Sequence, residues 1–266
     1  MYGLYQCLEC GSRFHDVGEH EQGDLSTFYD SIAVRRQVDA IEDRRYWGRE
    51  VRLIKGLCSV TVRKVLDVGC RSGDFLTQWP MDVQKHGIEL STHSASIARR
   101  RGLNVEMGPV EDTRFASMFD VVTAYAVLEH VTQPAEVLQR LSDLVAEGGV
   151  FAIMIPSYET WKARLLERSC RNWHMASPPN HLNYFSRRFL DVYLQSRGFS
   201  LARRRYTSGG MFNPLRRVPV ARSLCARTMS VLDTMSPLNR IPLFDHMYSY
   251  YVRRRTPQFA PAAGRD

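Results

Sequence analysis

Short apolar runs alternate with amphipathic segments through most of the chain, which is typical of strands and helices that follow one another in an α/β fold. The apolar runs predict strands at 65–68, 83–90, 104–107, 120–124, 150–156, 200–208 and 246–253. Helices are predicted between these strands, at 74–79, 94–101, 134–144 and 187–197.

Glycine, proline and serine mark the ends of several predicted helices. Pro80 ends the first helix near residue 79, and Gly102 is a C-cap for the second. The third helix is expected to end at Gly148 and Gly149, before the next strand begins. Ser186 is a favourable N-cap for the last helix, because its hydroxyl accepts a bond from a free backbone N–H group.

The remaining segments flank or interrupt this pattern. Residues 28–57 place apolar side chains at helical spacing, which predicts one or two amphipathic helices that cover a ligand pocket or pack against the sheet edge. The predicted organisation is a short arm at 1–25, N-terminal helices at 26–56, a main domain at 57–256 with an insertion at 209–244, and a disordered tail at 257–266.

The insertion at 209–244 mixes apolar residues with arginines and is predicted to be helical. A segment with one apolar and one basic face serves as a substrate lid, a homodimer surface or an interfacial membrane contact. The sequence does not choose among these roles.

One turn in the pattern predicts a ligand site. The strand at 65–68 contains Asp67 and ends at Gly69, and a second glycine follows at Gly73. Such a turn brings backbone N–H groups and a helix N-terminus close to a ligand, with no Cβ in the way. Its four-residue glycine spacing differs from the G-x-G-x-x-G of dinucleotide-binding folds. The alternative is a glycine turn that holds no ligand.

Composition places the chain among globular proteins. It has 266 residues, of which 44% are hydrophobic, enough for one large core. No run of about eighteen apolar residues is present, so a soluble, cytoplasmic protein is expected. The six cysteines are scattered apart from the first pair, and they do not suggest a disulfide framework.

The net charge of +8 comes from the C-terminal quarter. Residues 200–266 contain 12 arginines and 3 acidic residues, whereas the first 199 residues contain 24 basic and 25 acidic groups. This quarter either contacts phosphates, an anionic membrane surface or an acidic partner, or is a solvated basic surface. Bases and aromatic residues are not interleaved as in nucleic-acid-binding modules, so no sequence-specific nucleic acid is expected.

The N-terminal arm contains a possible half of a zinc site. Cys7 and Cys10 are two residues apart with Gly11 after them, and His15 and His20 follow at spacings that complete four ligands. Zinc binding by these residues is one interpretation. Two free cysteines in a mobile arm are the other.

The glycine turn and a later segment resemble motifs of the class I S-adenosylmethionine-dependent methyltransferases. The later segment, at 119–151, runs from FDVV through LEHV and a proline-initiated helix to GGVF. The H-x-x-Y-F-S stretch from His181 to Ser186 is similar to the usual end of small-molecule methyltransferases. The resemblance covers about 57–255. It implies a Rossmann-like, seven-stranded methyltransferase sheet with helices on both faces.

The same resemblance implies methyl transfer from S-adenosylmethionine to a small-molecule acceptor. The leading expectation is an oxygen of a sugar, a quinone precursor or a natural product. The acid in the first strand and the glycine turn would hold the amino-acid half of the cofactor. The acid that ends the second strand would bind its ribose. The loop after the third strand would flank its adenine, and the end of the fourth strand would lie beside its methyl group. These positions are Asp67, Gly69, Cys70, Gly73, Glu89, Leu90, Val110, Glu111 and Tyr125.

Two positions depart from the family pattern. Arg71 stands where the family usually has a third glycine, and Pro109 where it often has an acid, a role that Glu111 or Asp112 would then take. The cofactor site survives if Arg71 projects away from the pocket.

Two histidines are candidate catalytic residues. The loop before His181 is placed to cap the acceptor, and this imidazole either orients or deprotonates an acceptor hydroxyl or holds the loop in place. His130 follows Glu129 in the LEHV segment. This pair is either a helix-start acid with a packed imidazole, which we favour, or a metal or proton-transfer site.

Two rival functions remain at this point. A nicotinamide-dependent oxidoreductase would share the glycine turn and Glu89, but neither the glycine spacing nor the LEHV segment favours it. A non-catalytic ligand-binding module is favoured by Arg71 and Pro109 at cofactor positions.

Overall fold

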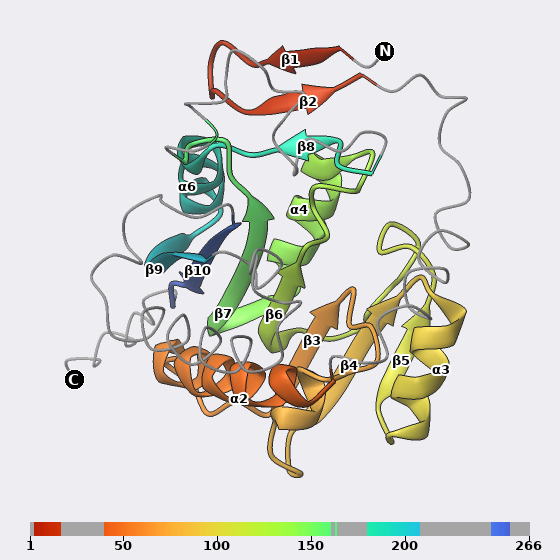
Figure 1. Ribbon diagram of the computed structural model, residues 1–266. Coiled ribbons are helices and arrows are strands. Elements are labelled where there is room, and N and C mark those ends of the chain that lie inside the picture. The colour runs from red at the N-terminus through yellow and green to blue at the C-terminus, as the bar shows by residue number, and fades with distance from the viewer. Residues whose placement is uncertain (1–2, 17–39, 161–162, 164–179, 208–245, 256–266) are drawn as a thin grey trace, which may run out of the picture.

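The computed structural model describes residues 3–16, 40–160, 163, 180–207 and 246–255 (Figure 1). The helices are α2 (Ala40–Leu57), η3 (Leu76–Gln78, a 3₁₀ turn), α3 (Thr92–Arg100), α4 (Pro134–Asp143) and α6 (Arg187–Ser196). The strands are β1 (Leu4–Gln6), β2 (Arg13–His15), β3 (Lys64–Val68), β4 (Gln84–Glu89), β5 (Asn104–Met107), β6 (Phe119–Tyr125), β7 (Val145–Pro156), β8 (Asn183–Tyr184), β9 (Phe199–Thr207) and β10 (His246–Arg253).

Seven strands form one central sheet in the order β5-β4-β3-β6-β7-β10-β9. Strands β3 to β7 run parallel, and β10 pairs antiparallel with both β7 and β9. All seven strands predicted from the apolar runs are present. The Rossmann-like seven-stranded sheet is thereby confirmed, and its parallel strands end at one edge, where open α/β sheets bind ligands.

Helices pack on both faces of the sheet, as predicted. On one face, α4 and α6 bury an apolar stripe that includes Leu138, Leu141 and Leu190. On the other face, α2, η3 and α3 pack over residues such as Ile54 and Ala98. The four α-helices are amphipathic, so burial of their apolar stripes drives the packing.

The helix predicted at 74–79 is wrong in type. Only the 3₁₀ turn η3 forms, and its C-cap residue Trp79 has an extended backbone immediately before Pro80. The loop from Gly69 uses most of the residues available before this proline. Too few remain for an α-helical turn to continue.

The expected role of Gly148 and Gly149 is also wrong. Helix α4 ends at Asp143, and strand β7 begins directly afterwards at Val145, so both glycines lie inside the strand. A Cβ on Gly149 would lie 2.6 Å from the carbonyl oxygen of Asp120 on β6. The pairing of β6 with β7 shifts register here, so the two glycines accommodate a β-bulge.

The N-terminal arm is folded against the main domain. Strands β1 and β2 form a hairpin, and β2 pairs with β8 through Arg13↔Tyr184 and Phe14↔Asn183. Figure 1 shows this small sheet beside the ends of α4 and α6. The described part of the arm therefore pairs with the segment that follows His181.

Several predicted segments lie outside the described residues. These are the part of the N-terminal helices before residue 40, the insertion at 209–244, the tail at 257–266, and most of the loop before His181. In the part of the chain that is described, no helix combines the length and apolarity needed to cross a membrane.

Candidate active site

Asp67 lies at the end of β3 and is 5% exposed. The hydroxyl of Thr123, on the neighbouring strand β6, donates to Asp67 Oδ1 at 2.5 Å. Burial raises the pKa of the Asp67 carboxyl to about 7, although the Thr123 bond opposes the shift. The site therefore presents a carboxyl group that a cationic ligand would ionise.

Glu89 ends the next strand and points its carboxylate back to the glycine turn. Its Oε2 accepts the backbone N–H of Arg71 at 2.7 Å, and its Oε1 accepts that of Ser91 at 2.8 Å. Burial raises the pKa of Glu89, while these two bonds favour the charged form. Each carboxylate oxygen accepts more than one bond, so both retain capacity for ligand hydroxyls.

Arg71 takes the backbone conformation that a glycine would supply. Its φ is +52°, in the left-handed region that non-glycine residues rarely adopt, and the residue is exposed. The turn thus keeps a glycine-like backbone while the arginine side chain extends toward solvent.

The turn does not present free N–H groups in the way we predicted. The backbone N–H groups of Gly69 and Cys70 both donate to the Ile88 carbonyl, and that of Gly73 donates to Cys70. Together with the Arg71 bond to Glu89, these contacts use the donors expected to hold the cofactor. The absent Cβ of Gly73 also serves packing, since it would lie 2.1 Å from Leu103 Cδ1.

Cys70 and Leu90 lie close in sequence to Asp67 and Glu89, and their side chains are in different environments. The Cys70 thiol faces the core, where a Cβ on Gly87 would lie 2.5 Å from its sulfur, and burial strongly raises its pKa. Leu90 is half-buried directly after Glu89. The thiol therefore does not point toward a ligand at the strand ends.

Arg140 shapes the loop predicted to flank the adenine. This α4 residue donates through Nη1 to the carbonyl oxygens of Val110, at 3.0 Å, and of Glu111. Val110 is buried in the core, whereas Glu111 is half-buried. Sequence reasoning missed Arg140, because an arginine within an amphipathic helix is indistinguishable from a solvated one.

Tyr125 closes β6 beneath helix α2. Its ring stacks on Trp47, with centroids 5.7 Å apart and an angle of 13° between the planes, and also contacts Phe75. Its hydroxyl donates to Glu50 Oε1 at 2.6 Å. The next residue, Ala126, has a φ of +55°, so a strained backbone leads out of this strand end.

Glu50 is the centre of a buried polar network that the sequence did not indicate. Its Oε2 accepts Arg205 Nη2 at 2.5 Å, and its Oε1 also accepts the Tyr250 hydroxyl at 2.7 Å. The Arg205 guanidinium lies 4.1 Å from the centre of the Tyr248 ring. These contacts join α2 to β9 and β10, and through Tyr125 to the site.

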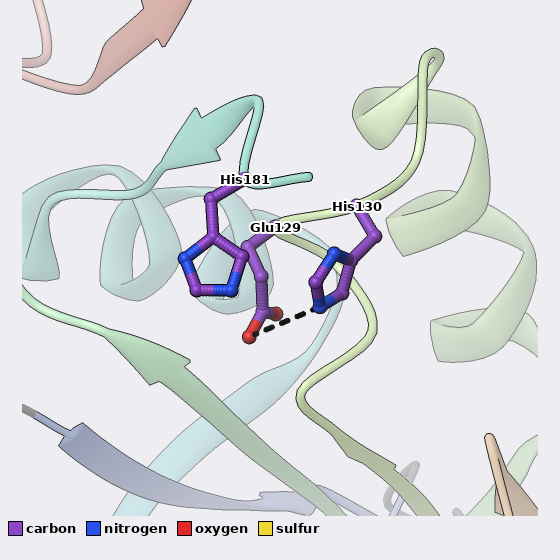
Figure 2. A group of neighbouring side chains, drawn as sticks. All are labelled: Glu129, His130 and His181. Carbon is purple, nitrogen blue, oxygen red and sulfur yellow. Dashed lines mark ion pairs between the residues drawn. The ribbon is translucent and has the colours of Figure 1, made fainter. Parts of the chain in front are cut away.

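Glu129, His130 and His181 form a second cluster near the strand ends (Figure 2). Glu129 is 1% exposed, and its burial raises the carboxyl pKa to about 8. Burial and His181 lower the pKa of His130 to about 4, so this imidazole is neutral. The contact of 3.9 Å between His130 Nε2 and Glu129 Oε1 is therefore not a true ion pair at neutral pH.

The N-terminal cysteines occupy the hairpin turn, where Gly11 N–H donates to the Cys7 carbonyl. Hydrogen bonds from the backbone of Cys10 and Glu9 lower the pKa of the Cys7 thiol. His15 pairs with Leu4 at the opposite end of the hairpin, about 10 Å along the strand from the turn. It therefore does not join both cysteines around one ion. His20 lies outside the described residues.

The family comparison agrees with the fold. Residues 36–203 match the model of the methyltransferase domain family, and this stretch is more than half of the chain. The chain belongs to this family.

Relatives of known function are ubiquinone biosynthesis O-methyltransferases. The protein from Bordetella avium is 40% identical over 102 residues, which are 34% of this chain and 42% of that protein. The one from Albidiferax ferrireducens is 28% identical over 187 residues, or 62% of this chain and 69% of that protein. The chain thus matches less than half of the length of the Bordetella avium protein.

Solved structures show the same fold at low identity. Magnesium protoporphyrin IX methyltransferase from Synechocystis, solved with bound S-adenosylhomocysteine, has a TM-score of 0.57 at 14% identity, covering 86% of this chain and 98% of that one. A plantazolicin methyltransferase has a TM-score of 0.55 at 16% identity, covering 87% and 95%.

Proposed function

We propose that the protein transfers a methyl group from S-adenosylmethionine to an oxygen of a small-molecule acceptor. The observation that carries the proposal is the pair of buried carboxyl groups at adjacent strand ends, Asp67 and Glu89, beside a second titratable cluster at 129–181. The relatives that act as O-methyltransferases support oxygen as the acceptor atom.

The residues at the strand ends fit the cofactor chemically. Asp67 and Glu89 are both buried carboxyl groups with raised pKa values, so a cationic ligand would stabilise their charged forms. Glu89 retains acceptor capacity for ribose hydroxyls. The exposed side chain of Arg71 argues against a degenerate, non-catalytic module, for which Pro109 is the other ground.

S-adenosylmethionine, when bound, supplies a methyl group that is attached to a sulfonium sulfur. A nucleophile attacks the methyl carbon, and the sulfur leaves as a neutral thioether. We assign His181 as the base that takes the acceptor's hydroxyl proton. With the cofactor bound, the acceptor oxygen would form the new bond to the methyl carbon as the carbon–sulfur bond breaks. Proximity and alignment supply most of the remaining rate enhancement.

Rapid mass-spectrometric detection of S-adenosylhomocysteine would test the proposal. The full chain is incubated with the cofactor and matched acceptor pairs that differ only in a hydroxyl or an amine, including phenols, sugars and anilines. We expect turnover with a hydroxyl acceptor and a large loss of kcat in H181N. Turnover confined to amines would overturn oxygen transfer, and absence of cofactor binding by calorimetry would overturn the assignment of the cofactor residues.

An anionic surface and a second copy of the chain are two further proposed partners. Contact of the basic C-terminal quarter with an anionic surface, and homodimer formation through the insertion, both concern residues that are largely outside the described ranges. Vesicle sedimentation and analytical ultracentrifugation of the full chain would test them.

A further inference from the structure

The turn that joins β1 to β2 (Figure 1) carries Cys7 and Cys10. The Gly11 N–H donates to the Cys7 carbonyl at 2.9 Å, and this bond across four residues makes the backbone of 7–11 a single helical turn. Side chains three residues apart on such a turn are neighbours, with Cβ atoms about 5–6 Å apart. A disulfide needs Cβ atoms at about 3.5–4.5 Å, so a small contraction of the turn can join the two sulfurs.

Cys7 differs from the cysteines of the main domain in its environment. Hydrogen bonds from the backbone of Cys10 and Glu9, and from the Cys10 side chain, lower the pKa of the Cys7 thiol. Burial instead raises the pKa of the Cys58 thiol to about 12, and that of Cys70 still further. Because the thiolate is the form that reacts with oxidants, Cys7 is more reactive than either of these two thiols.

Both cysteines of the turn are also accessible to a small molecule in solution. Each is partly exposed, whereas Cys70 is 4% exposed. Thiols that sense oxidants typically combine a low pKa and exposure with a second cysteine that resolves the oxidised form. The turn supplies all three of these features, and the mechanism of methyl transfer uses neither cysteine.

We propose that Cys7 and Cys10 form a redox-active dithiol, which a hydroperoxide converts to a disulfide within the turn. The Cys7 thiolate attacks one oxygen of the peroxide, the O–O bond breaks, and the leaving oxygen takes up the proton lost by Cys7. The Cys10 sulfur then attacks the sulfur of the resulting sulfenic acid, the S–O bond breaks, and the oxygen leaves as water with the proton of Cys10. With hydrogen peroxide, two thiols thus give one disulfide and two waters, and a dithiol reductant reverses the oxidation.

The turn also contacts the start of helix α6. The Cys10 carbonyl accepts the Ser186 hydroxyl at 2.5 Å, and the Ser12 hydroxyl accepts the Ser186 N–H at 3.1 Å. The same Ser186 oxygen accepts the Phe189 N–H at 3.0 Å and so caps the helix. Because the contraction that joins the two sulfurs moves the Cys10 carbonyl, oxidation weakens its bond to Ser186 and loosens the cap.

This inference goes beyond the proposed function and does not rest on it, because thiol oxidation is measured without cofactor or acceptor. The test uses the full chain as the variant C170S/C225S, since those two cysteines lie outside the described residues, after treatment with a chelator. The native protein is exposed to hydrogen peroxide and quenched with an alkylating reagent. We expect two of the four remaining thiols to be lost, one peptide that contains Cys7 and Cys10 to lose the mass of two hydrogen atoms, and dithiothreitol to restore both thiols.

C58S is the matched control, because Cys58 is a half-buried cysteine outside the turn. The disulfide should form in C58S as in the background variant, whereas C7S and C10S should each form none. Alkylation of Cys7 in the reduced protein should be at least about tenfold faster than that of Cys58 at neutral pH. Amide hydrogen exchange at Phe189 should be about fivefold faster in the oxidised protein, in line with the loss of one supporting hydrogen bond.

Three results would overturn the dithiol: retention of all four thiols, oxidation that dithiothreitol does not reverse, or disulfides between chains on a non-reducing gel. Disulfide formation with unchanged exchange at Phe189 would overturn the coupling to α6 alone. An equal increase in exchange after peroxide treatment of C7S would overturn that coupling too, because the effect would then arise outside the turn.

Discussion

The Glu50 carboxylate and the Arg205 guanidinium form an ion pair of 2.5 Å between helix α2 and strand β9, and both side chains are more than nine-tenths buried. Two residues separated by 155 positions thereby fix the N-terminal helix onto the antiparallel edge of the sheet. Because Tyr125 also donates to Glu50, this pair connects the stability of the fold with the shape of the site.

Removal of one partner of this pair should be strongly destabilising. We expect E50A to lower the free energy of unfolding by about 3–5 kcal/mol, because the Arg205 charge would remain buried without its partner. R101A is the comparison, since the pair of Arg101 with Asp74 is partly exposed and should contribute about 0–1 kcal/mol. Urea denaturation measures both. Equal losses in the two variants would contradict the prediction.

Two tyrosines donate to the same oxygen of Glu50, and the hydroxyl of one of them, Tyr250, also accepts Arg205 Nε at 2.8 Å. Tyr125 ends β6 at the site, and Tyr250 lies in β10. We expect Y125F and Y250F to lose similar stability, about 0.5–1.5 kcal/mol each. Only Y125F should lower kcat or raise the KM for the cofactor. Parallel kinetic changes in both variants would show that the network acts on stability alone.

The raised pKa of Asp67 predicts a pH dependence of stability. The folded protein binds the proton with a pKa of about 7, against an ordinary value of 3.8, so the folded state holds more protons than the unfolded state between these values. Stability contributed by this group is therefore full below about pH 4 and falls as pH rises toward 7, by up to about 1.4 kcal/mol per pH unit.

The variant D67N isolates the contribution of Asp67. Glu89 lies nearby and also raises the pKa of Asp67. Because Glu89 is present in both the wild type and D67N, its titration contributes to both proteins. Urea denaturation from pH 4 to pH 8 measures the unfolding free energy of the wild type and of D67N. The stability of the wild type relative to D67N should fall as the pH rises. A difference that stays constant would mean that Asp67 is ionised throughout.

Substitutions at Arg71 separate its backbone from its side chain. R71G should bind the cofactor as the wild type does, because glycine adopts the observed φ of +52° without strain. R71V should destabilise the turn by about 1–2 kcal/mol, since a β-branched residue resists the left-handed region. Calorimetry and thermal unfolding would measure both effects. A loss of cofactor affinity in R71G would instead identify the guanidinium as a ligand contact.

Features with local sequence signals were predicted well. Apolar runs located all seven strands of the central sheet, and Ser186 caps α6 by accepting the Phe189 N–H, as its position before the helix indicated. The helix after Gly73 and the role of Gly148 were wrong, because a glycine signals a backbone requirement without stating whether a turn, a bulge or a close contact needs it.

Long-range relationships were beyond the reach of the sequence. Glu50 and Arg205 each belong to a segment with many charges, and nothing local distinguishes the two that become buried. His130 and His181 were both singled out, but separately, since their contact across 51 positions depends on how β8 returns to the turn after β6. The orphaned oxygen of Glu129 likewise becomes evident only when the surrounding backbone is in place.

The pairing of β2 with β8 makes the start of the chain a structural support for residues near position 180. The His15 N–H donates to the Leu182 carbonyl, one residue beyond His181. Deletion of β1 and β2 would therefore remove a direct support of the segment that carries His181, far away in sequence.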